Sequence, residues 1–221
     1  MQSPEHKDEM EELLMDGTTL SKAAKIIIKV GEQIEEMNEI LGERLIEALT
    51  GEMRVVYSSD YSKDSKGGWM IMHYLWNIAL YKGTRKKNPD AHIAVKTVLY
   101  HEHDSNIQGW VPSIYVMYSP DKSPFDLNDT FWIFDTLNKE NEYRLEEDHR
   151  LWHWETNKKN DSWAFCIPLV KMNNEKDLIN QIVEPVKNLI KQTANAFPER
   201  CDAFHFIQED NGLRILDENH K

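Results

Sequence analysis

Residues 149–170, HRLWHWETNKKNDSWAFCIPLV, contain two runs rich in aromatic and β-branched residues around a short polar break. The runs 149–156 and 162–170 have the composition of strands, and the break 157–161 has the length of a hairpin loop. A parallel pair would need a crossover connection, usually a helix, and no helical pattern separates these runs. The stretch therefore predicts neighbouring antiparallel strands.

Further runs with a two-residue periodicity predict a sheet region that spans residues 53–170. The other strands expected there are 54–58, 69–81 (in one piece or two), 92–101, 113–118 and 130–137. Near the C-terminus, runs 203–208 and 213–216 flank Asn211-Gly212, a pair that favours the left-handed residues of a tight turn. This pattern predicts a C-terminal hairpin over 203–216.

A first helix is predicted over residues 18–50, because its apolar positions step by three and four. They form one stripe of Leu20, Ala23, Ile27, Val30, Ile34, Met37 and Leu41. Thr18 or Thr19 can cap its start, and Gly51 can end it in a left-handed conformation.

The same stripe is close to a heptad repeat, which is the pattern of a coiled coil. However, Arg44 occupies one heptad position, and Ala23 is small for such a seam. We therefore expect the helix to pack on its own sheet, with a homodimer through helix 18–50 as the alternative.

A second helix is predicted over 174–197, with Asn173-Asn174 as its cap. Pro185 should kink or restart it, because proline lacks the amide donor and clashes with the carbonyl four residues back. The expected fold is α+β: a mainly antiparallel twisted sheet packed against an N-terminal and a C-terminal amphipathic helix. Residues 1–17 are expected to be an acidic segment, flexible or a short helix, before a single domain over 18–221.

The composition limits the classes of partner and location. The chain of 221 residues has 26 Lys and Arg against 38 Asp and Glu, a formal net charge of −12, which repels phosphate backbones. The basic run 82–87 precedes a turn signal, so we interpret it as a solvated loop. With two cysteines, no secretory signal and no apolar tract long enough for a bilayer, the sequence indicates a reduced, cytoplasmic protein without a membrane partner.

A candidate metal site is the segment YHEHD, residues 100–104. On a strand, His101 and His103 would project from one face and could share a divalent metal with Asp104. The HExxH pattern is missing, so further ligands would have to come from distant residues such as His73 or His153. The plainer interpretation, which we favour, is the polar end of a strand entering a loop.

A candidate ligand-binding platform is formed by Arg150, Trp152 and Trp154, which would share one face of a strand. Indoles beside a guanidinium can stack on a base, sugar or peptide, although burial in the core is the simpler role for them. Cys166 is expected to be a buried structural thiol, and Cys201 to be exposed.

No complete catalytic motif is present: the sequence contains no P-loop, no G-x-G-x-x-G, no G-x-S-x-G and no CxxC pair. We therefore expect a non-catalytic binding or regulatory module inside the cell that recognises a protein or a small ligand. The alternatives are a metal-dependent hydrolase or nuclease built around residues 101–104, and an acidic inhibitor that mimics nucleic acid.

Overall fold

The computed structural model describes residues 17–66, 70–83, 87–99, 107–108, 111–120, 144–145, 149–156, 160–192, 197–198, 201–209 and 212–216. The chain divides into two compact units, Met1–Glu39 and Ile40–Lys221. The boundary lies within the first described helix, α2 (Gly17–Thr50).

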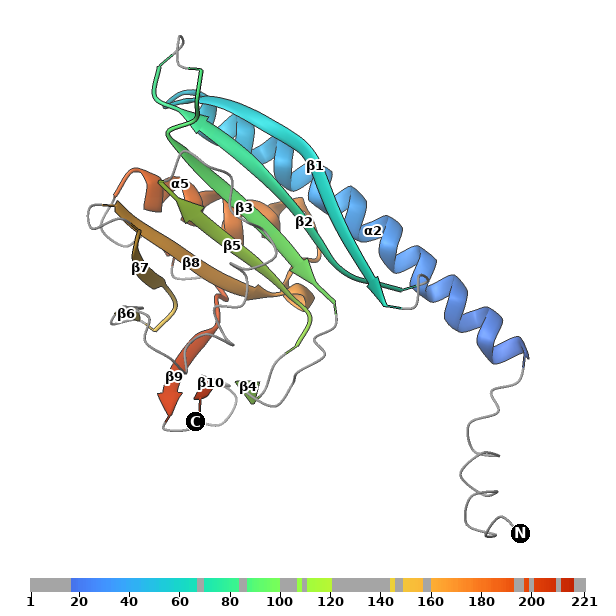
Figure 1. The fold of residues 1–221 in the computed structure, drawn as a ribbon. Helices are drawn as coiled ribbons and strands as arrows, with labels where there is room; N and C mark the ends of the chain where they lie inside the picture. Colours follow the sequence, from blue (N-terminus) through green and yellow to red (C-terminus); the bar gives the residue numbers. More distant parts are fainter. Residues whose placement is uncertain are drawn as a thin grey trace, which may run out of the picture. The chain divides into compact units, whose positions relative to one another are not determined.

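The second unit is built on a seven-stranded sheet in which every pair of neighbours is antiparallel (Figure 1). In spatial order its strands are β1 (Arg54–Lys66), β2 (Met70–Tyr81), β3 (Ala91–Val98), β5 (Ser113–Ser119), β8 (Asn160–Pro168), β7 (Trp152–Thr156) and β6 (Arg144–Leu145). The pair β7–β8 is the antiparallel pair predicted from residues 149–170. The predicted α+β class with a mainly antiparallel sheet is confirmed.

Several strand boundaries differ from the prediction. β1 extends to Lys66, beyond the predicted residue 58, and β2 is a single strand. β3 ends at Val98, before the YHEHD segment. β7 begins at Trp152, three residues after the predicted start, and His149 has a left-handed φ of 58°. β8 ends at Pro168 and continues as a 3₁₀ turn, Leu169–Lys171. The predicted strand 130–137 lies outside the described residues.

A second, three-stranded sheet joins β9 (His205–Glu209), β10 (Gly212–Leu216) and β4 (Ile107–Gln108). β9 and β10 pair antiparallel with Gly212 opposite Glu209, so the predicted C-terminal hairpin is confirmed. The parallel pairing of β10 with β4 was not predicted, because β4 has only two residues and its partner is far away in the sequence.

The C-terminal helical segment consists of α4 (Glu175–Leu178), a π-helical turn (Ile179–Val183) and α5 (Glu184–Ile190). Asn174 is its cap, as predicted: the side-chain Oδ1 accepts a hydrogen bond of 3.1 Å from the backbone N–H of Asp177. The helix ends at Ile190, short of the predicted residue 197, and Gln192 has a φ of 53°.

The π turn has its cause in Pro185. Proline has no N–H to donate to the carbonyl of Gln181, so the regular i to i−4 ladder is interrupted there. The carbonyl of Gln181 instead accepts a hydrogen bond from Cys201 Sγ at 3.6 Å. The Gln181 side chain also joins Asp202, donating to Oδ2 at 2.8 Å and accepting from the backbone N–H at 2.6 Å. Cys201 itself is buried, so the prediction that it is exposed was wrong.

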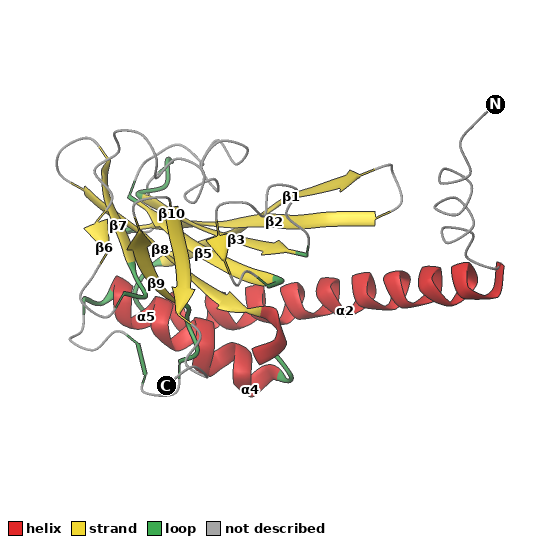
Figure 2. Ribbon diagram, turned by 90° about the horizontal axis from the view of Figure 1, so that it is seen from below, coloured by secondary structure: helices red, strands yellow, loops and turns green. Residues whose placement is uncertain are grey.

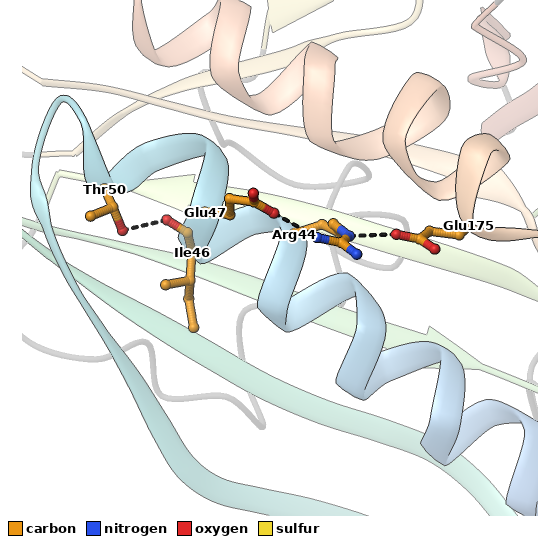
Figure 3. Close-up of polar contacts among 5 residues, drawn as sticks. All are labelled: Arg44, Ile46, Glu47, Thr50 and Glu175. Atoms are coloured by element: carbon orange, nitrogen blue, oxygen red, sulfur yellow. Dashed lines mark hydrogen bonds and ion pairs between the residues drawn. The ribbon is translucent and has the colours of Figure 1, made fainter.

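Arg44, the residue that interrupts the heptad pattern, connects the end of α2 to α4 (Figure 3). Its guanidinium donates to Glu175 at 2.5 Å and to Glu47 at 2.6 Å. These hydrogen bonds, first to Glu47 and then to Glu175, raise the pKa of Arg44.

Both ends of α2 differ from the prediction. Among the described glycines only Gly83 has a positive φ, 109°, so Gly51 is not left-handed. Instead, the backbone N–H groups of Glu52 and Met53 both donate to Leu49 O. At the other end α2 already includes Gly17, which places Thr18 and Thr19 inside the helix.

Candidate functional site

One face of the seven-stranded sheet is apolar. Trp76, Val95, Val116 and Phe165 lie opposite one another on four neighbouring strands and are buried; we call their side of the sheet the apolar face. Phe165 meets Phe197, which follows α5, edge to face at 5.3 Å between ring centroids. Figure 2 shows α4 and α5 on one side of the sheet, and we place the apolar face on that side.

The other face carries most of the buried polar groups of these strands. Tyrosine and tryptophan apart, the described strands bury seven polar or charged side chains, and only Thr97 lies on the apolar face. The other six define the polar face: Asn77, His92, Lys96, Ser113, Ser119 and Ser162. Lys96 is 6% exposed and is the only lysine, arginine, aspartate or glutamate among the buried residues that the structure describes.

The strand register places these groups beside one another. Lys96 on β3 lies between Leu75 on β2 and Tyr115 on β5, and Tyr115 in turn lies opposite Cys166 on β8. Two residues along each strand, Ala94 lies opposite Met117 on the same face. Two residues further, His92 lies opposite Ser119. Directly opposed side chains in such a sheet have Cβ atoms about 5 Å apart. The polar face thus combines an ammonium, an imidazole, an amide and several hydroxyls.

Cys166 lies within this face, where its surroundings keep the thiol protonated. Complete burial raises the pKa of its thiol far above the ordinary value, and side-chain hydrogen bonds with Ser113 and Tyr115 only partly oppose that shift. The reactive form of cysteine is the thiolate, so a thiol kept protonated is inert. The prediction that Cys166 is buried is confirmed.

Of the residues of the predicted platform, Trp152 belongs to the polar face. Its indole is 3% exposed, and its ring meets Phe206 at 5.2 Å between centroids, within a cluster that includes Met117 and Cys166. Arg150 instead lies over the ring of Phe197 at 4.8 Å, in the bend before β7. For Trp154 the structure gives the strand register, in which it pairs with Ser162. The structure brings Arg150 and Trp152 to different aromatic partners, and a shared platform stays a prediction.

The predicted metal ligands His101, His103 and Asp104 lie outside the described residues. Within the described part of the chain, no three His, Cys, Asp or Glu side chains gather closely enough to hold a metal ion. The metal site at 101–104 therefore also stays a prediction.

The polar face was missed because its residues form an ordinary strand pattern. In residues 91–98, AHIAVKTV, His92 and Lys96 alternate with Ile93, Val95 and Thr97, as in a strand with one wet face. In the structure all eight of these residues are buried. The sequence feature that could have indicated the polar face was a lysine and a histidine on the same face of one strand.

Comparison of the chain with known protein families, with curated proteins and with solved structures finds no match. In the described residues, no helix has both the length and the apolar character needed to cross a bilayer.

Proposed function

We propose that the protein is a non-catalytic, intracellular binding module whose polar face holds a small organic anion. The observation that carries the proposal is the segregation of the buried polar groups: six lie on the polar face and one on the apolar face. Ligand sites typically combine an apolar lining with a few polar groups that orient the ligand. Leu75, Ala94, Met117 and Trp152 supply such a lining.

Lys96 sets the charge of the ligand. Moving an ammonium out of water is costly, so a buried lysine on a central strand marks a position where positive charge is retained. An ammonium attracts and hydrogen-bonds carboxylates and phosphates, while His92 and Asn77 can supply additional donors.

The proposal can be tested by measuring thermal unfolding of the full chain with a panel of aromatic and aliphatic carboxylates and phosphate monoesters. A ligand that binds the folded state raises the midpoint, by an amount that grows with the logarithm of its concentration once that concentration exceeds its Kd. We expect at least one anion to raise the midpoint of the parent protein and of Lys87→Met, an exposed control lysine, but not that of Lys96→Met.

An equal response of Lys96→Met and the parent would contradict the proposal, as would a panel without any stabilising anion. Metal analysis of protein purified without chelator addresses the competing hydrolase. Near-stoichiometric metal that is lost in a folded His101→Ala/His103→Ala variant would favour the metal-dependent enzyme instead.

A further inference from the structure

Residues 203–206, which lead into β9, lie beside the second half of β8. β7 pairs with only the first half of β8. Beyond that pairing, the backbone N–H of Phe204 donates to Cys166 O on β8 at 2.9 Å. Two residues later the N–H of Phe206 donates to His149 O, in the bend before β7, also at 2.9 Å. The segment therefore takes the place next to β8 where the pairing with β7 has ended.

The two phenylalanines of this segment pack against the polar face. Phe206 is 1% exposed and belongs to the same buried cluster as Cys166, Met117 and Trp152. Its ring meets that of Trp152 edge to face at 5.2 Å between centroids, and that of Phe204 at 6.1 Å. Phe204 itself is partly buried against the cluster. The segment therefore covers the part of the polar face around Cys166 and Trp152.

The attachment of this segment to the rest of the sheet unit is uneven. At its start, Asp202 makes two hydrogen bonds with the Gln181 side chain, of 2.8 and 2.6 Å, and its Oδ1 lies 3.3 Å from Lys171 Nζ. Further on, β9 pairs with β10, and β10 with β4, in a sheet separate from the main one (Figure 1). Within the described residues, the backbone bonds that join β9 and its approach to the region of β7 and β8 are those of Phe204 and Phe206.

We propose that residues 203–216 form a lid that opens about Asp202 and uncovers the polar face while the seven-stranded sheet stays folded. Opening breaks the two bonds from Phe204 and Phe206 and the two-residue pairing of β10 with β4. Segments held by so few backbone bonds open locally at a lower free energy than global unfolding. The use of this opening as the route by which an anion reaches the buried Lys96 rests on the proposed function, whereas the opening itself does not.

Labelling of Cys166 with iodoacetamide measures the opening. The reagent attacks the thiolate, and in the closed state this thiol is fully buried and protonated. The full chain with Cys201→Ala keeps Cys166 as its single thiol. Its labelling rate should give a free energy of opening below that of global unfolding, and a weaker dependence on urea because less surface is exposed. Labelling with the same free energy and the same urea dependence as global unfolding would overturn the lid.

Two further variants in the same background separate local opening from global unfolding. Phe206→Leu weakens the packing of the lid, so labelling of Cys166 should become about tenfold faster. Val116→Ala, on the apolar face, lowers the free energy of global unfolding but should leave the labelling rate unchanged, because that side chain stays buried when the lid opens. A labelling rate that rises in Val116→Ala by the factor expected from its lost stability would overturn the proposal.

The link to the anion site is tested with an anion that raises the thermal midpoint of the parent. Such an anion should slow the labelling of Cys166, because it binds the closed state, and it should have no effect in Lys96→Met. Equal labelling rates with and without a stabilising anion would overturn the entry route. If no anion stabilises the chain, the proposed function fails, while the effects of Phe206→Leu and Val116→Ala on labelling still decide whether the lid opens.

Discussion

Cys166 is a residue whose surroundings determine its chemistry more than its type does. The thiol has hydroxyl neighbours at Ser113 and Tyr115, which favour its ionised form, but complete burial outweighs them and raises its pKa. Lys96 lies on the same face, and there too the position of the group in the sheet, and not the local sequence, makes it notable.

A pH dependence of stability follows from the raised pKa of Cys166. Above about pH 8.5 the unfolded thiol loses its proton while the folded thiol keeps it, so the free energy of unfolding should fall as pH rises. The stabilisation is complete below the ordinary thiol pKa, and the extra loss should approach about 1.4 kcal/mol per pH unit above it. Urea unfolding of the parent and of Cys166→Ala between neutral and alkaline pH measures this difference. Parallel pH profiles for the two proteins would contradict the assignment.

At the scale of elements, the C-terminal helix shows how one proline reorganises its surroundings. Pro185 removes a donor, a π turn forms before it, and Gln181 makes three hydrogen bonds to residues 201–202. The turn therefore ties the helix to the segment that leads into β9. Pro185 itself was a clear sign of a break, whereas the partner of the freed carbonyl could not be predicted.

The side chain of Gln181 should be essential to this connection. Replacing it by leucine removes both side-chain hydrogen bonds to Asp202, and we expect a loss of about 1 to 3 kcal/mol in the free energy of unfolding. Urea unfolding of Gln181→Leu, Asp202→Ala and the double variant completes a mutant cycle. The double variant should lose less than the two single variants together. Additive losses would mean that the two residues act independently.

At the scale of the molecule, the unit boundary divides α2 into a first part with exposed apolar residues and a last part with buried ones. Leu41, Leu45 and Leu49 are buried, and Arg44 binds Glu175 of α4, so the last turns of α2 belong to the sheet unit. The first turns expose apolar residues and segregated charges.

Removal of residues 1–33 tests whether the first turns of α2 are needed for the sheet unit to fold. We expect the remaining chain to keep a cooperative thermal transition and near-ultraviolet circular dichroism, because the buried leucines of α2 and the ion pair of Arg44 with Glu175 are retained. Loss of the cooperative transition would show that the first turns of α2 are part of the sheet unit.

Local sequence patterns were enough to predict the helices and strands that are determined by neighbouring residues. Two-residue alternation around 157–161 predicted an antiparallel pair, a stepwise stripe predicted α2, and Asn174 and Pro185 marked a cap and a break. β1 was predicted too short because polar residues fill its second half, where pairing with β2 provides the strand geometry.

The candidate site depended on contacts between distant residues. Alternation assigns His92 and Lys96 to one face of a strand, but whether that face is wet depends on what covers it, and the burial of both faces of β3 appears only in the folded chain. In the same way the burial of Cys201, and its hydrogen bond to the carbonyl of Gln181 twenty residues earlier, appear only in the folded chain. Periodicity records which residues share a face, whereas burial and the pKa shifts that follow from it arise from segments far apart in the sequence.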